Sequence, residues 1–278
     1  MSSAALFAAI VKRDEAAALN VLSKGLGKDV LNVTDAFGHT ALNYACATGF
    51  SEAVVLKLIE LGSNASKVNN MGTSPAMHAL FHPYSGKVFE ALVQAGADLR
   101  YQNSAGCTAL HVACMSRTTV ERIKLLIKLG ADINAADKSS HTPLHTAVRC
   151  SQDYIIVDYI ASICKDVNAK TENDPKHAEW TALHFAALLH SPALCATLIK
   201  RGADIDAVNW AGNTAESLCD IKTKTAMLSA NNYKVNIMPY LDGKTKAPER
   251  KLGKLQNKSQ AFVHQSRPST AIKKKMPV

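Results

Sequence analysis

A hydroxyl side chain recurs in this sequence at a nearly constant interval, and this regularity constrains the fold more than any other feature. The intervals are 34, 34, 34, 39 and 33 residues, and the six positions are Thr40, Ser74, Thr108, Thr142, Thr181 and Thr214. A second motif keeps the same period: an apolar helical pattern closes on a glycine that Asn or Asp follows two residues later, at Gly62, Gly96, Gly130 and Gly202. Two motifs in one period indicate internal repeats, each of them one supersecondary unit.

Each unit is expected to hold a turn, two short helices and an extended link. The hydroxyl residue can cap free backbone N–H groups at the start of the first helix, and Pro143 fits a first helical position. The closing glycine permits the left-handed backbone conformation that ends the second helix. A unit of this size cannot bury its own apolar face, so neighbouring units must stack into one continuous core.

The best copies of the motif resemble the ankyrin repeat, whose signature is T-P-L-H-x-A; they are Thr108–Ala113, Thr142–Ala147 and Thr181–Ala186. The resemblance covers about residues 4–231 and implies an all-α solenoid of helix-turn-helix units with β-hairpin loops. It places an N-terminal capping repeat at 1–34, five repeats at 35–208, a truncated C-terminal cap at 209–231 and a basic, disordered tail at 232–278. Counting the cap as the first unit, repeats two to six span 35–68, 69–102, 103–136, 137–175 and 176–208.

No pattern in the sequence predicts catalysis. His111, His145 and His184 occupy the same slot of three repeats, so the repeat itself explains them, and they would lie too far apart to share a metal ion. The chain has neither a Gly-x-Ser-x-Gly elbow nor a Gly-rich phosphate loop after a strand. We therefore expect a non-enzymatic protein without a metal site or cofactor.

Cysteine usage and hydropathy predict an intracellular protein. The seven cysteines are scattered and form no Cys-x-x-Cys pair, which favours buried, reduced thiols over disulfides or zinc. No segment approaches the roughly 18 apolar residues of a membrane helix, and the N-terminus lacks the basic region of a secretory signal. We expect a cytoplasmic monomer without a membrane span, with the nucleus as the alternative compartment.

The positions that a repeat leaves free of packing flank the hydroxyl residue or end the first helix. In a stacked array they would line a concave, extended surface that suits a protein partner. The candidate partner-binding residues are Phe37, His39, Met71, Phe81, His82, Met115, His141, Arg149, Trp180 and Trp210, and Lys138 and Leu189 are further free positions. Phe37, Trp180 and Trp210 are candidate hot spots, because the repeat does not require large aromatics there. The alternative is that they pack on an adjacent hairpin or insertion.

Repeat three departs from the signature. Met77 replaces the His, which costs about one hydrogen bond, on the order of 1 kcal/mol. Phe81-His82-Pro83-Tyr84 separates its two helices, and Pro83 is expected to begin the second. This repeat is either a soft point in the stack or a place where Phe81 and Tyr84 serve a partner.

Repeats five and six are separated by an insertion. Cys164 replaces the terminating glycine of repeat five, and the loop from Asn168 to Trp180 carries five extra residues by the spacing of 39 against 34. Insertions in repeat proteins go to loops, often on the binding side. A tolerated surface insertion is the alternative, since added loop length costs little.

One modification is implied by the resemblance. The sequence Leu126…Asp132-Ile133-Asn134 is similar to ankyrin hairpins that are hydroxylated on asparagine, which makes Asn134 a possible substrate position. The alternative is that Asn134 only forms hairpin hydrogen bonds.

The net charge of +9 is concentrated at the C-terminus. Residues 241–278 hold ten basic and two acidic side chains, a net +8, which leaves +1 for the rest. The candidate polyanion contacts are Lys244, Lys246, Arg250, Lys251, Lys273, Lys274 and Lys275.

The leading function is a scaffold or adaptor that binds a protein on its concave face, with the tail as a second contact. The alternative is nucleic-acid or other polyanion binding, or nuclear targeting, through the tail; a plainly solvated tail is the simplest interpretation.

Overall fold

The computed structural model describes residues 3–116, 118–151, 153–172, 174 and 176–236. Contacts divide the chain into two compact units, Met1–Asn231 and Asn232–Val278. The predicted disordered tail starts at 232, but the last helix continues to Asn236, so the prediction starts the tail too early; residues 237–278, including the basic residues from 241 onward, lie outside the described residues. The helical pairs that the period predicts all lie in the first unit.

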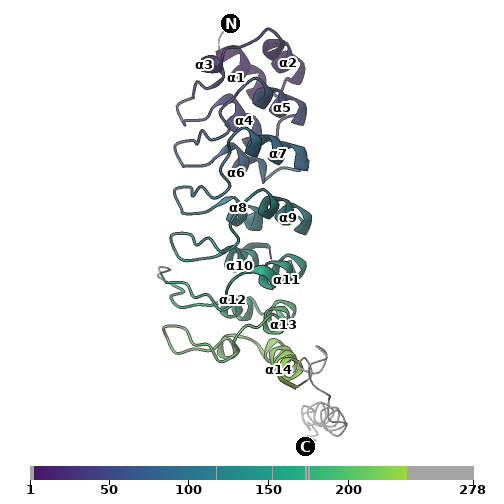
Figure 1. Ribbon diagram of the computed structural model, residues 1–278. Coiled ribbons are helices and arrows are strands. Elements are labelled where there is room, and N and C mark those ends of the chain that lie inside the picture. Colours follow the sequence, from purple (N-terminus) through teal and green to yellow (C-terminus); the bar gives the residue numbers. More distant parts are fainter. Residues whose placement is uncertain (1–2, 117, 152, 173, 175, 237–278) are drawn as a thin grey trace, which may run out of the picture. The chain divides into compact units, whose positions relative to one another are not determined.

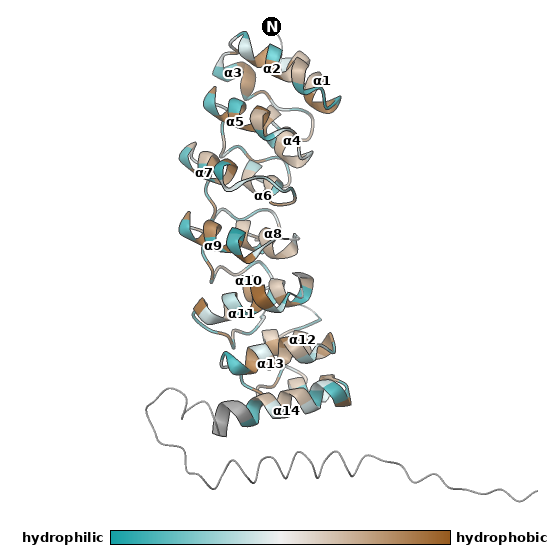
Figure 2. Ribbon diagram, turned by 90° about the vertical axis from the view of Figure 1, so that its right-hand side faces the viewer, coloured by the Kyte–Doolittle hydropathy of each residue, from teal (hydrophilic) through white to brown (hydrophobic). Residues whose placement is uncertain are grey.

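The first unit is a stack of these helical pairs (Figure 1). Seen from the side, the pairs form two columns, one of inner and one of outer helices (Figure 2). The inner helices are α1 (Ser3–Val11), α4 (Ala41–Ala47), α6 (Pro75–Ala79), α8 (Ala109–Met115), α10 (Pro143–Thr146) and α12 (Ala182–Leu188). The outer helices are α2 (Glu15–Ser23), α5 (Glu52–Glu60), α7 (Gly86–Gln94), α9 (Val120–Lys128), α11 (Tyr154–Ile163) and α13 (Pro192–Lys200). The remaining elements are α3 (Lys28–Leu31), the π-helical segment η1 (Ala147–Ser151), the 3-10 segment η2 (Ala215–Leu218) and α14 (Ile221–Asn236).

The signature residues cap the inner helices and connect neighbouring repeats. Thr108 and His111 form a capping box, in which His111 Nδ1 accepts the Thr108 N–H at 3.1 Å. The other ring nitrogen, Nε2, lies 2.9 Å from the His141 carbonyl of the next repeat. His184 repeats this arrangement with the Asn213 carbonyl at 3.1 Å. His111 and His184 thus cap a helix and link two repeats, and His145 caps its own helix by accepting the Thr142 N–H at 3.2 Å.

Asn43 fills the same slot in repeat two. Its Oδ1 accepts the Thr40 N–H at 3.1 Å, and its Nδ2 donates to the Lys67 carbonyl at 3.0 Å. An amide thus supplies both the acceptor and the donor that imidazole supplies elsewhere. The signature names only histidine at this slot and so does not predict the equivalence.

The same set of bonds closes the hairpins that start at Asp35, Asn69, Asn103, Asp137 and Asn209, but not the hairpin that carries the insertion. Asp35 accepts the N–H groups of residues two and four positions on, and the turn needs a positive φ, which Gly38 supplies at +79°. Adjacent tips are linked, because Asn70 N–H donates to the Phe37 carbonyl at 3.0 Å and Ser104 N–H to the Met71 carbonyl at 3.1 Å. Over the described residues the hairpins contain no regular strand, only an isolated bridge between Val208 and Thr214.

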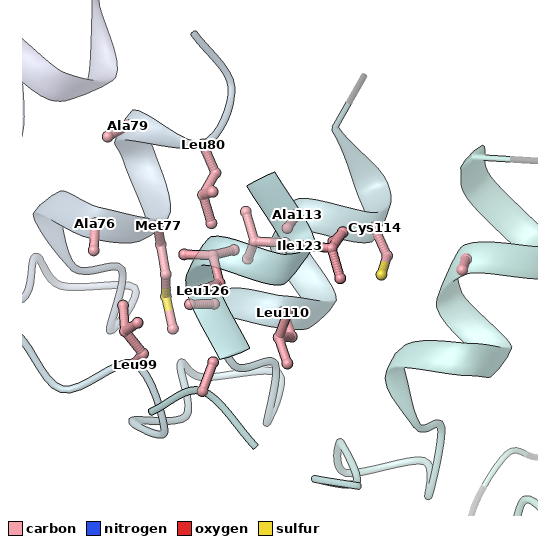
Figure 3. Packing of buried hydrophobic residues seen from close by; sticks show 14 of the residues in the cluster. Ala76, Met77, Ala79, Leu80, Leu99, Leu110, Ala113, Cys114, Ile123 and Leu126 are labelled. Atoms are coloured by element: carbon pink, nitrogen blue, oxygen red, sulfur yellow. The ribbon is translucent and has the colours of Figure 1, made fainter. Parts of the chain in front are cut away.

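Repeat three is well tied into the stack. Met77 is fully buried in the same apolar cluster as Leu99 and Leu126 (Figure 3). Tyr84 is also buried, and its hydroxyl donates to the Phe50 carbonyl at 2.7 Å, so it does not face a partner. The expectation that Pro83 begins the second helix is wrong: α7 begins at Gly86, because Ser85 occupies the N-cap and bonds to Glu52.

Candidate functional site

The ten candidate partner-binding residues fall into three classes of exposure. Six are exposed: Phe37, Met71, Phe81, Met115, Arg149 and Trp210. His39 and His82 are half-buried, and His141 and Trp180 are buried. The last two cannot present their side chains to a partner, which corrects the expectation for them.

Four of the exposed residues form two rows across repeats two to four. Phe37 and Met71, each 70% exposed, occupy the same register on adjacent hairpin tips; we call these the tip row. Phe81 and Met115 occupy the same register, seven residues after Ser74 and Thr108; Met115 ends α8, Phe81 lies two residues after α6, and together they form the inner-helix row. Both rows consist of large apolar side chains in contact with solvent.

Aromatic and imidazole rings lie between the rows in repeats two and three. The His39 ring packs against Tyr44 at 6.1 Å and against His78 at 5.7 Å between centroids. His39 Nδ1 lies 3.4 Å from Asp35 Oδ2, and His39 Nε2 lies 3.0 Å from Asn69 Nδ2. The side-chain polar atoms of Asp35, His39 and Asn69 therefore contact one another.

Two histidines of repeat three are held by the repeat before it. Burial, followed by the charges of His39 and His82, lowers the pKa of His78 to about 4, so it is neutral at physiological pH. His82 Nε2 lies 2.9 Å from the Ala47 carbonyl, and its ring covers Gly49, where an added Cβ would meet His82 Nδ1 at 2.4 Å. His82 thus packs within the stack more than it faces a partner.

Trp180 and His141 are covered by aromatic side chains and by the insertion. Trp180 is 7% exposed, and its ring lies 5.0 Å from Phe185 and 4.8 Å from His177. His141 packs against Phe185 at 5.8 Å. The alternative stated for large aromatics, packing on a neighbouring insertion, holds for Trp180.

The insertion folds inward. The Thr171 N–H donates to the Trp180 carbonyl at 2.9 Å, which closes the hairpin around the extra residues. Asp174 Oδ2 lies 3.3 Å from His141 Nε2 and 3.0 Å from His177 Nδ1. Although burial acts to raise it, the pKa of Asp174 lies below its usual range, because the Lys176 N–H and His177 stabilise the anion. Asp174 and His177 thus contact the stack, while Glu172, Lys176 and Glu179 stay exposed.

Arg149 covers the same cluster from the inner helix. It lies in the π-helical segment that continues α10, and its guanidinium lies 5.2 Å from the Phe185 ring centroid. Its Nη1 is 2.9 Å from His141 Nε2. Arg149 has the register of Phe81 and Met115, so the inner-helix row changes from apolar to cationic at repeat five.

Trp210 stands apart from the two rows. It is 64% exposed on the last hairpin, and its N–H donates to the Ala178 carbonyl of the insertion at 3.4 Å. The exposure fits a contact residue, but no other candidate lies on that hairpin.

Asn134 takes part in the hairpin ladder. Its Oδ1 accepts the Lys165 N–H at 2.7 Å, as Asn32 and Asn168 accept those of Asn64 and Asp204. This bond accounts for the residue without a modification. Hydroxylation of Asn134 stays a prediction, which peptide mass spectrometry of native material tests by the mass of one added oxygen.

Two histidine pairs spaced four apart, His78 with His82 and His141 with His145, were not predicted as candidates although that spacing can bind metal on a helix. Among the residues that the structure describes, no group of three or more His, Cys, Asp or Glu is placed to hold an ion.

Of the cysteines, Cys46, Cys114 and Cys195 are buried and Cys150 is exposed, so fewer are buried than expected. No helix in the described part is long and apolar enough to cross a membrane.

Comparison with known proteins supports the repeat assignment. A family model of three ankyrin repeats matches residues 6–103 and 82–171, and a single ankyrin-repeat model matches residues 179–210. The chain belongs to the ankyrin-repeat family. Ankyrin repeats generally mediate protein–protein interactions and are typically non-enzymatic.

Solved ankyrin structures resemble this chain over most of its length. The ankyrin repeat domain of Bcl-3, a member of the IkappaB protein family, is 26% identical with a TM-score of 0.65, and the match covers 81% of this chain and 97% of that one. The human ASB11 ankyrin repeat domain is 23% identical with a TM-score of 0.65, over 81% and 96% of the two chains, and shows the fold alone. No curated protein matches significantly.

Proposed function

We propose that this ankyrin-repeat protein is a non-enzymatic scaffold or adaptor, and that it holds a protein partner on the concave face along repeats two to four. The observation that carries the proposal is the pair of rows: Phe37 and Met71 on the tips, Phe81 and Met115 on the inner helices. Large apolar side chains that stay exposed in adjacent repeats are typical of protein-binding sites.

The position of the insertion supports the same location. In repeats five and six the equivalent region is filled by Asp174, Trp180 and Phe185, all of them buried. The partner would therefore meet repeats two to four, with Arg149 at the border.

The experiment is partner capture with the full chain, with Phe81→Ser/Met115→Ser and with a matched control. The control is Tyr154→Ser/Ile155→Ser on α11, where the two side chains are 58% and 50% exposed on an outer helix. We expect the first variant to lose the partner and the control to keep it, both with wild-type melting. Equal capture by all three proteins would refute the proposed face.

A second function is favoured by the charge distribution: contact with nucleic acid or another polyanion through residues 241–278, which carry a net +8. Such binding weakens steeply with salt because counterions are released. We expect it to disappear on deletion of residues 241–278 and to be untouched by Phe81→Ser/Met115→Ser. Capture of the protein partner should show the reverse pattern.

A further inference from the structure

A cation lies near the repeat-five end of each row. On the tip of repeat five, the exposed Lys138 precedes Ser139, which has the register of Phe37 and Met71; the Lys138 N–H donates to the Ala105 carbonyl of repeat four at 3.3 Å, and its side chain lies over Gly106. On the inner helices, Arg149 follows Phe81 and Met115 in register. Repeat five thus places one exposed cation in the inner-helix register and one beside the tip register, next to the exposed apolar side chains of repeats two to four; the inner-helix register is apolar again at Leu188 in repeat six.

Among the described residues, the hairpin tips of this face carry no carboxylate that would oppose an acidic partner. The tip segments 36–39, 70–73, 104–107 and 138–141 contain no Asp or Glu. Asp35 and Asp137, which start two of the hairpins, are bound by backbone N–H groups and by His39 and His141. The charge that a partner would meet here is positive and is confined to one end.

The distance between successive residues of a row indicates which secondary structure a partner would have. Neighbouring repeats pack at the usual helix separation of about 10 Å. A helix lying along the stack repeats one face every seven residues, or about 10.5 Å, which matches this interval. An extended strand repeats one face about every 6.6 Å or 13 Å and loses register after one repeat.

We propose that the occupant is an amphipathic α-helix of a partner protein, about 20 residues long, that lies along repeats two to five. Its apolar residues recur at heptad spacing and cover Phe37, Met71, Phe81 and Met115. Its first turn is acidic and lies over Lys138 and Arg149, so its N-terminus points to repeat five. Acidic residues in the first turn also stabilise the partner helix through its dipole. This inference rests on the proposed function and adds the partner's structure and direction.

The experiment selects random 20-residue peptides from a display library with the full chain as bait, then measures the selected peptides as synthetic probes. We expect peptides with apolar residues seven apart and Asp or Glu in the first turn, which become helical by circular dichroism when bound. Phe81→Ser or Met115→Ser should weaken binding about tenfold or more. Tyr154→Ser should leave it unchanged.

The direction is tested by charge reversal. Arg149→Glu and, separately, Lys138→Glu should each weaken binding about tenfold, and an acidic-to-Lys change in the first turn of the peptide should restore it. Lys138→Glu is included because Arg149 also contacts His141 and its replacement could disturb the fold.

The outcomes separate the two proposals. Selected peptides that are Pro-rich or that alternate in polarity would overturn the proposed helix, as would a selection without enrichment. Helical peptides that carry their acids at the C-terminal end, or whose binding does not respond to either charge reversal, would overturn its proposed direction. If partner capture still depends on Phe81 and Met115, the proposed binding face stands without the helix. If capture is also insensitive to them, both proposals fail.

Discussion

The same repeat slot is open near one end of this stack and closed near the other. His39 and His141 both precede the hydroxyl cap and both face an Asp at the start of their hairpin, at 3.4 Å in each case. In repeat two the His39 side chain stays 19% exposed, whereas in repeat five the insertion supplies Asp174 to His141, whose side chain is 5% exposed. The repeat therefore sets the position of a side chain, and the neighbouring loop decides whether a partner can reach it.

The two tryptophans give the largest test of this difference. Trp180→Ala should lower the free energy of unfolding by about 3–5 kcal/mol, because it removes a buried ring from Phe185 and His177. Trp210→Ala is the matched control and should change it by less than about 0.5 kcal/mol, because the ring is exposed. Urea unfolding followed by circular dichroism measures both. If Trp180→Ala lowers the free energy of unfolding only slightly but abolishes partner capture, Trp180 belongs to the binding face.

The second largest expected effect is the destabilisation of repeat five by acid. Burial, followed by the charge of His141, lowers the pKa of His145 to about 4. An unfolded histidine takes up its proton near pH 6.5, so between pH 6.5 and 4 protons favour the unfolded chain. Stability should therefore fall by about 3 kcal/mol from this group as the pH drops through that window, and level off below it.

Urea unfolding at pH 7, 6, 5 and 4 measures the fall, with His145→Asn as the comparison. Asn43 shows that an amide serves in this slot, so the variant keeps the capping acceptor and removes the titration. Its stability should depend less on pH than that of the wild type by about the same 3 kcal/mol. Identical pH profiles would mean that His145 takes up its proton at the same pH in the folded and the unfolded chain, so that burial does not lower its pKa.

The charge of Asp174 in the insertion should contribute less to the free energy of unfolding than Trp180 or His145. Asp174→Asn keeps an acceptor for the Lys176 N–H but removes the charge between His141 and His177, and should cost about 1–2 kcal/mol. Asp158→Asn is the control: it loses an exposed pair with Arg201 and should cost under about 1 kcal/mol. Thermal melting compares the two, and hydrogen exchange at Thr171 and Trp180 reports whether the insertion has opened. Equal small losses with unchanged exchange would show that the insertion does not depend on Asp174.

The sequence predicts the architecture well because the period is a local signal. Capping residues, the turn glycines and the apolar face of each helix repeat at a fixed interval, and each contacts only its own or the next repeat. The exposed positions on the inner helices, Phe81 and Met115, are predicted by the same register.

The sequence predicts burial in the insertion poorly because its contacts obey no period. In the insertion, one carboxylate, Asp174, meets two histidines, His141 and His177, that lie in different parts of the sequence. Burial of Trp180 results from that packing and from Phe185. Likewise, the role of Asn43 becomes visible only when the bond to Lys67 is seen, since the signature names histidine.

The smallest expected effect concerns the open tips. Phe37→Ser and Met71→Ser should each change the free energy of unfolding by less than about 0.5 kcal/mol, because both side chains are 70% exposed and Phe37 has only the His39 ring at 6.3 Å beside it. Chemical denaturation measures this, and partner capture is recorded on the same samples. A loss above about 1 kcal/mol would assign these residues to packing. Unchanged stability with reduced capture would instead mean that the fold holds two large apolar side chains in water for the partner, which is the opposite of what it does with Trp180.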